Sequence, residues 1–324
     1  MPFNWLFAIV AGAIILFLAI FASTRYVSIE RYKYDTEIAT QLSLLLNPLE
    51  TTIASATATE IKMPTKLKLS LSCKFTGMGK EDIKISTLSN IGNKWQTYGA
   101  KVSIYNKYIF SNSQEEGQRL YLFSKTFNMP FKIADLIYLT TSEFCFVNPP
   151  EVIASELSDL EMRNIRIVKN KKECGKSTKK MKTVCFGIGE CEINVYGQCY
   201  GYECSNSYKE YEYGFVEINN QENKIERLYY LGPELLYAAI FSSPSIYICN
   251  LQRIMYRIIM VSRLYIEKIN ILKARGCNTG DLEKRLSELI MQASSSLRSN
   301  NIIQMKKIAE EVNNINSGLV CKIF

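Results

Sequence analysis

An uninterrupted apolar segment at residues 5–22 is the strongest constraint on how this chain folds. Its eighteen residues include no polar side chain, and as a helix they extend about 27 Å at about 1.5 Å per residue. This length is close to the hydrocarbon thickness of a bilayer. The sequence therefore predicts one membrane-spanning helix, with the lipid bilayer as its partner.

The next most apolar run, residues 231–249, is interrupted by Pro233, Glu234 and Pro244. These residues make a second span unfavourable, so this run is interpreted as a buried core element.

The helical pattern continues beyond the apolar segment. Apolar residues recur every three or four positions at Ile29, Tyr32, Ile38, Leu42, Leu45, Leu46 and Leu49, and Pro48 is the first strong helix breaker. We therefore predict a single helix over residues 3–46 whose second half is an amphipathic stalk. Residues 1–50 form the anchor and stalk, and the small polar residues 51–59 form a turn or linker.

This outline resembles type IV pilins and the pilin-like or TadE-like surface proteins, in which an apolar helix continues into an amphipathic one. The resemblance covers about the first 50 residues and implies a filament subunit. The chain has neither the short basic leader nor the acidic residue near the start of the apolar run that such pilins carry. A plain single-pass anchor with a stalk is the prediction, and a filament subunit is the alternative.

Residues 66–150 alternate apolar and polar side chains, which is typical of strands. Strands are predicted at 66–71, 83–85, 100–109, 119–126 and 136–147, in a mostly antiparallel sheet. A short helix is predicted at 151–162, after Pro149 and Pro150. Residues 51–160 are therefore assigned to a sheet-rich domain.

The net charge of +8 has a local origin. A basic segment over residues 163–182 carries a single acid, Glu173, and nine basic residues: Arg163, Arg166, Lys169, Lys171, Lys172, Lys176, Lys179, Lys180 and Lys182. A solvated loop is predicted, and an anionic lipid head group or an anionic surface polymer is its candidate partner. No aromatic residue is interleaved with these lysines, which disfavours nucleic acid.

Cysteine content bears on the compartment. The ten cysteines are Cys73, Cys145, Cys174, Cys185, Cys191, Cys199, Cys204, Cys249, Cys277 and Cys321. Their spacings contain no C-x-x-C pair, which a zinc site usually requires. Disulfides in an oxidising compartment are therefore favoured over zinc ligands and over buried thiols. Cys73 and Cys145 lie in or at the ends of predicted strands, where they either face one another across the sheet or are simply buried.

Residues 161–243 are interpreted as a basic, cysteine- and tyrosine-rich β region with strands at 191–196 and 211–218. Six tyrosines gather there, at positions 196, 200, 202, 208, 211 and 213. Such tyrosines either form a binding surface or, as is more common in proteins, pack beneath loops.

The chain then becomes helical to its end. Apolar periodicity predicts helices over 248–272, 281–297 and 302–315, and short connections predict that residues 244–324 form an antiparallel three-helix bundle. In that arrangement Cys277 pairs with Cys321, and Cys249 pairs elsewhere. The cysteine-bracketed helices after a tyrosine-rich head resemble uncharacterised single-pass surface proteins of small-genome archaea, and this resemblance implies no activity.

Two signals conflict on which side of the membrane the bulk lies. Arg25, Arg31 and Lys33 follow the span, and the positive-inside rule would keep them in the cytoplasm. The cysteines favour the outside, and we give them more weight. A cleaved signal peptide is a further alternative, although the segment has no basic start and a poor cleavage site.

Histidine is absent, which removes the commonest general base and the usual zinc ligand. No catalytic motif, cofactor site or metal site is predicted. The sequence predicts an α+β, disulfide-stabilised ectodomain on a membrane anchor, serving as a structural or interaction protein at the cell surface. The alternatives are a cytoplasmic-facing subunit that binds anionic lipid or nucleic acid through the basic segment, and a carboxylate-dependent glycan hydrolase.

Overall fold

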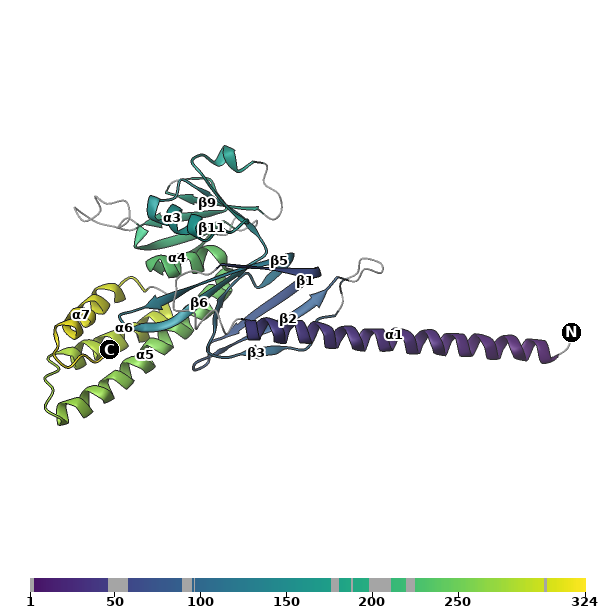
Figure 1. Cartoon of the computed structure of the whole chain (residues 1–324), viewed down its shortest axis with the longest axis horizontal. Helices are drawn as coiled ribbons and strands as arrows, with labels where there is room; N and C mark the ends of the chain where they lie inside the picture. Colours follow the sequence, from purple (N-terminus) through teal and green to yellow (C-terminus); the bar gives the residue numbers. More distant parts are fainter. Residues whose placement is uncertain are drawn as a thin grey trace.

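The computed structural model describes residues 3–45, 58–88, 95, 97–175, 181–187, 189–197, 211–219, 225–299 and 302–324. The chain is an α+β protein with a long N-terminal helix, two mixed sheets and C-terminal helices (Figure 1). The predicted α+β class is confirmed. Most of the predicted linker lies outside the described residues, and the first strand begins at Thr59.

Helix α1 (Phe3–Leu45) is continuous over 43 residues, or about 64 Å, as the periodicity predicts. Its first half has no protein around it: the described side chains from Trp5 to Val27 are exposed, apart from a half-buried Ala11. Figure 1 shows this half as a rod that projects from the body of the molecule. In the second half, Ala39 and Leu42 are buried where the helix packs on strands of the first sheet.

The first sheet has the strand order β3-β2-β1-β5-β6-β4. Its strands are β1 (Thr59–Lys74), β2 (Lys80–Thr87), β3 (Val102–Ile104), β4 (Tyr108–Phe110), β5 (Gln114–Asn128) and β6 (Lys132–Thr140). The β4–β6 pairing is parallel, and the other described pairings are antiparallel. α1 packs on β2 and β3, so the anchor is joined to this sheet.

The second sheet has the order β12-β11-β10-β9-β7-β8 and mixes both directions. Its strands are β7 (Glu143–Val147), β8 (Ile165–Val168), β9 (Met181–Phe186), β10 (Ile193–Gly197), β11 (Tyr213–Asn219) and β12 (Ile225–Leu231). β7 pairs in parallel with β8 and β9, and β9 in parallel with β10. Both sheets are therefore mixed: among the described pairings, six are antiparallel and four are parallel.

The prediction of one strand over residues 136–147 is wrong. Thr141 and Ser142 separate β6 from β7, and the two strands belong to different sheets. The sequence pattern does not reveal this break, because successive residues of both β6 and β7 are buried and both strands therefore have the same apolar character.

Helix α4 (Gly232–Phe241) lies between the two sheets and contacts strands of both, as Figure 1 shows. All of its residues from Leu235 to Phe241 are buried. Phe241 meets Phe123 of the first sheet at 5.3 Å and Phe144 of the second at 4.5 Å, measured between ring centroids. The interpretation of residues 231–249 as a buried core element is confirmed.

The remaining helices include the predicted short helix after Pro150 and the C-terminal helices. They are α3 (Glu151–Asp159), α5 (Pro244–Ala274), α6 (Leu282–Ser299) and α7 (Met305–Gly318), with the short 3-10 helix η1 (Lys171–Cys174) before β9. α6 packs against both α5 and α7. One hydrophobic cluster runs from both sheets through α4 into these helices, and a second one joins the first sheet to α1.

Replacing Phe241 by alanine should lower the free energy of unfolding by about 3–5 kcal/mol, because the ring fills the space between both sheets. Chemical denaturation followed by circular dichroism measures this change. Leu264→Ala is the control, since Leu264 is 62% exposed and its loss should cost little. Equal losses in the two variants would contradict the central position of α4.

Candidate functional site

The junction between α1 and the first sheet positions the head on its anchor. The side chain of Asp35 is fully buried there, and its Oδ1 accepts a hydrogen bond of 2.8 Å from the hydroxyl of Thr87. One residue along, the hydroxyl of Thr36 accepts a bond of 2.8 Å from the backbone N–H of Ala100. These bonds tie successive residues of one helical turn to two separate segments of the head.

Gly99 is required at this junction. A Cβ atom added there would lie 2.8 Å from the backbone nitrogen of Thr36, which is closer than real Cβ contacts. The helix backbone therefore approaches the chain at Gly99 directly. Together with the buried Ala39 and Leu42, this close packing makes the stalk and the first sheet one rigid unit.

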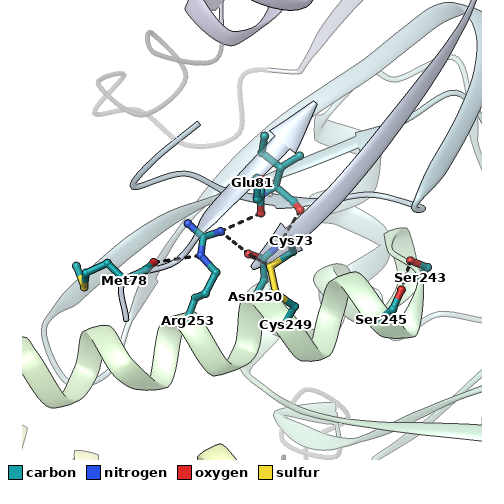
Figure 2. The surroundings of a disulfide bond; sticks show 9 residues. Cys73, Met78, Glu81, Ser243, Ser245, Cys249, Asn250 and Arg253 are labelled. Carbon is teal, nitrogen blue, oxygen red and sulfur yellow. Dashed lines mark hydrogen bonds and ion pairs between the residues drawn. A yellow bond between two sulfur atoms is a disulfide. The ribbon is translucent and has the colours of Figure 1, made fainter. Parts of the chain in front are cut away.

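A second junction joins the first sheet to α5, through a disulfide and a buried ion pair (Figure 2). Cys73, near the end of β1, is bonded to Cys249 in the second turn of α5. Beside it, Nη1 of Arg253 donates to Oε1 of Glu81 at 3.1 Å and to Oδ1 of Asn250 at 2.7 Å. All three of these polar side chains have no exposed surface.

The hairpin between β1 and β2 closes over this ion pair. Nε of Arg253 donates to the carbonyl of Met78 at 3.2 Å, and Figure 2 shows this bond at the tip of the hairpin. Gly79 has a φ of +65°, and a Cβ atom there would lie 2.8 Å from the Arg253 side chain. Glycine at this position therefore lets the hairpin and the arginine pack together.

Burial sets the electrostatics of the pair. It raises the pKa of Glu81 to about 7, although the charge of Arg253 and the N–H of Ile109 both act to lower it. Removing a charged pair from water is costly, and the hydrogen bonds of Arg253 compensate for part of this cost. The sequence analysis did not identify Asp35, Glu81, Asn250 or Arg253.

The disulfide prediction is confirmed for the described cysteines. They pair as Cys73–Cys249, Cys145–Cys174, Cys185–Cys191 and Cys277–Cys321, so the predicted C-terminal bridge is present. The suggestion that Cys73 faces Cys145 is wrong, because the two residues lie in different sheets. Cys199 and Cys204 lie outside the described residues.

The basic segment is not a single loop. Arg166 lies in β8, Lys171 and Lys172 lie in η1, and Lys182 lies in β9. Arg163, Arg166, Lys169, Lys171 and Lys172 are exposed, whereas Lys176, Lys179 and Lys180 lie outside the described residues. The exposed members border the edge strand of the second sheet, and α1 packs on the first.

Lys182 is not part of this exposed group. Its Nζ donates to Oδ1 of Asn112 at 3.0 Å and lies 5.8 Å from the ring centroid of Phe144. Burial lowers the pKa of Lys182, while Glu115 and Glu192 act to raise it. The prediction that Lys182 contacts an anionic partner is therefore corrected: its side chain faces inward and bonds Asn112.

A surface cleft of about 300 Å³ lies where the β5–β6 turn, the start of α4 and α7 meet. Glu212, Glu234 and Glu310 line it, and Nζ of Lys306 lies 2.6 Å from Oε2 of Glu212 and 3.7 Å from Oε1 of Glu310. Burial raises the pKa of Glu234. This cleft brings carboxylates together, as the carboxylate-dependent alternative requires.

The described tyrosines of the cluster are half-buried and pack against neighbouring side chains. Tyr196 stacks on Phe215 at 5.0 Å, and Tyr211 meets Phe186 edge-on at 5.3 Å between centroids. Nζ of Lys306 lies 5.0 Å from the ring centroid of Tyr213. The other three tyrosines lie outside the described residues. Within the part of the chain that the structure describes, no group of three or more cysteine, aspartate or glutamate residues is arranged to hold a metal ion.

Comparison with known proteins adds no family. The chain matches no protein-family model, no curated protein and no solved structure. Its function therefore has to be argued from the anchor, the two junctions and the disulfides.

Removing one partner of the buried pair should be strongly destabilising. Arg253→Met leaves Glu81 without its cation and should lower the free energy of unfolding by about 3–5 kcal/mol. The double variant Glu81→Gln/Arg253→Met should recover part of this loss. As a matched control, Arg227→Gln breaks an exposed pair with Glu217 and should cost about 1 kcal/mol or less.

The raised pKa of Glu81 predicts the sign of a pH effect. Between pH 4.5 and about 7 the folded state holds the proton of Glu81 more tightly than the unfolded state does. This contribution to stability is complete below pH 4.5 and is lost as the pH rises towards 7. Denaturation across this range should show a steeper fall in wild type than in Glu81→Gln, and parallel curves would contradict the assignment.

Proposed function

We propose that this protein is a membrane-anchored, cell-surface structural or interaction protein whose disulfide-stabilised ectodomain is held on a rigid stalk. One observation carries the proposal: a single helix is apolar and exposed over one half and packed into the head over the other. An exposed apolar helix of this length is stable when the hydrocarbon core of a bilayer surrounds it. The stalk then fixes how the head is presented above the membrane.

The disulfides support an oxidising location for the head. The bridges join segments that are up to 176 residues apart, so they belong to the folded domain and not to a local loop. Structural disulfides of this kind are rare in reducing compartments. Arg25, Arg31 and Lys33 argue for the opposite orientation, but three cations are a weaker signal than a set of disulfides built into the fold.

The cytoplasmic alternative would require the basic segment to meet a membrane or a nucleic acid. The exposed basic residues border the second sheet, whereas the anchor packs on the first sheet. Contact with the head groups of the same membrane is therefore not favoured by this arrangement. An anionic polymer at the surface remains the partner that the basic residues suit.

Finer features of the proposal follow from the same framework. We infer that α5, α6 and α7 form an antiparallel three-helix bundle closed by Cys277–Cys321, a view that the α5–α6 and α6–α7 contacts support. A pilin-like filament subunit is the alternative role of the anchor. Catalysis is not part of the proposal.

Deleting residues 1–24 should release a soluble head with its bridges intact, because the remaining chain keeps both junctions. Membrane flotation at high salt measures the release, and mass mapping without reduction measures the thiols. Leu18→Arg in the full chain is a second variant, since a charge in mid-span should weaken insertion.

Protease shaving of intact cells tests the orientation separately. Digestion of the head from outside together with paired thiols would support the proposal. A truncated chain that still floats with membranes, or free thiols in a protected head, would overturn it.

A further inference from the structure

Three buried hydrogen-bond donors around Tyr108 have no partner among the described residues. They are the second terminal nitrogen (Nη2) of Arg253, Nε of Arg257 and the hydroxyl of Tyr108, against one buried acceptor of the same cluster that is also unpartnered, Oε2 of Glu81. In Figure 2 this nitrogen of Arg253 points away from Glu81 and Asn250, which occupy the other one. Unmade hydrogen bonds of buried charged groups are costly, so a set of three in one place calls for an acceptor.

The three groups are neighbours. The guanidinium carbon of Arg253 lies 4.7 Å from the ring centroid of Tyr108, so the arginine covers the face of this ring. Arg257 follows Arg253 by one helical turn and therefore lies on the same face of α5. Burial raises the pKa of Tyr108, while the charges of Arg257 and Arg253 and a side-chain interaction of Arg257 with the phenol act to lower it.

The charges around Tyr108 leave a surplus. Arg253 is balanced by Glu81, whereas no ion pair with Arg257 is found among the described residues. Two guanidinium groups against one carboxylate give a net charge of +1 when Glu81 is ionised, and of +2 when it holds its proton below a pH of about 7. A monoanion would neutralise this surplus, while a dianion would add repulsion from Glu81.

The helix face that carries the two arginines runs from the interior to the surface. Tyr108 and Arg253 are buried, Arg257 is half-buried, and Met260, further along the same face of α5, is 41% exposed. Met78, whose carbonyl binds Arg253, is 39% exposed at the tip of the hairpin. The arginines therefore lead from the interior to the surface along one helix face.

We propose that Tyr108, Arg253 and Arg257 form a binding site for a carboxylate. A carboxylate has two oxygens with about four acceptor positions, which is enough for the three donors, and it carries the single negative charge that the site lacks. The carboxylate belongs either to a small free acid or to the C-terminus of a peptide. Either source enters beside Met78 and Arg257.

The full-length protein in detergent micelles tests the site by titration with sodium acetate, followed by thermal unfolding and by the ¹⁵N signals of arginine Nε. Wild type should show a saturable rise in Tm and a shift of one partly buried Nε signal. Arg257→Gln should lose about tenfold or more in apparent affinity, because a charge-assisted bond is removed. Arg257→Lys, which keeps the charge but lacks the Nε donor, should be intermediate.

Arg263→Gln is the matched control, since Arg263 lies on the same helix, is exposed and loses the same charge. It should bind acetate as wild type does. A second arm titrates a short peptide with a free C-terminal carboxylate, with the same peptide as its amide for comparison. If the peptide acid binds more tightly than acetate, the source of the carboxylate is a peptide. If the peptide acid and acetate bind equally, the source is a small acid. No saturation in wild type, or equal effects in Arg257→Gln and Arg263→Gln, would mean that water fills the site and would overturn the proposal.

Discussion

Among the residues that the structure describes, none covers the apolar half of α1, and the rest of the molecule is arranged around this constraint. Residues 5–22 include eleven leucine, isoleucine, valine and phenylalanine side chains. On insertion scales these contribute about 3–7 kcal/mol in favour of lipid. The head therefore does not shield the span. It holds the stalk that follows, through Asp35, Thr36 and the close approach at Gly99.

The first sheet lies between the anchor and the helices, so its attachments determine whether the head is rigid. A buried ion pair is weak in net stability but specific in geometry, because Arg253 of α5 bonds both Met78 and Glu81 of the β1–β2 hairpin, and also Asn250 on its own helix. The neighbouring Cys73–Cys249 bridge closes a loop of 176 residues, worth about 5 kcal/mol in the chain-entropy account. The ion pair thus fixes the register of hairpin and helix, and the disulfide adds the stability.

Long periodic features were predictable from the sequence, whereas long-range contacts were not. The span, the stalk and the C-terminal helices follow from local apolar spacing, which survives whatever the tertiary contacts are. Arg253 was missed because a charged residue within a helix normally indicates the solvent face, and only the covering hairpin with Gly79 reverses this. Leu251, Ile254 and Met255 beside it were the available signal that this face is buried.

The second sheet shows the same limit in its strands. β8 is four residues long, and parallel pairing with β7 joins segments that have no turn between them to indicate it. The basic residues over this stretch suggested a loop. Lys182 cannot be told by its residue type from the other lysines of the basic segment. Only its position in β9, from which its Nζ bonds Asn112, turns it inward.

Two of the described disulfides, Cys145–Cys174 and Cys185–Cys191, lie at an edge of the second sheet where apolar burial is thin, and this bears on the compartment. The edge strand β8 is only half-buried, and η1 beyond it has Cys174 as its one buried residue. Cys145–Cys174 ties η1 to the interior strand β7, and Cys185–Cys191 joins the same small cluster. This edge has little hydrophobic packing of its own, so with free thiols it would be held mainly by backbone pairing to β7. A fold that relies on oxidised cysteines at its weakest edge is suited to an oxidising space, which is the physical reason for placing the head outside the cytoplasm.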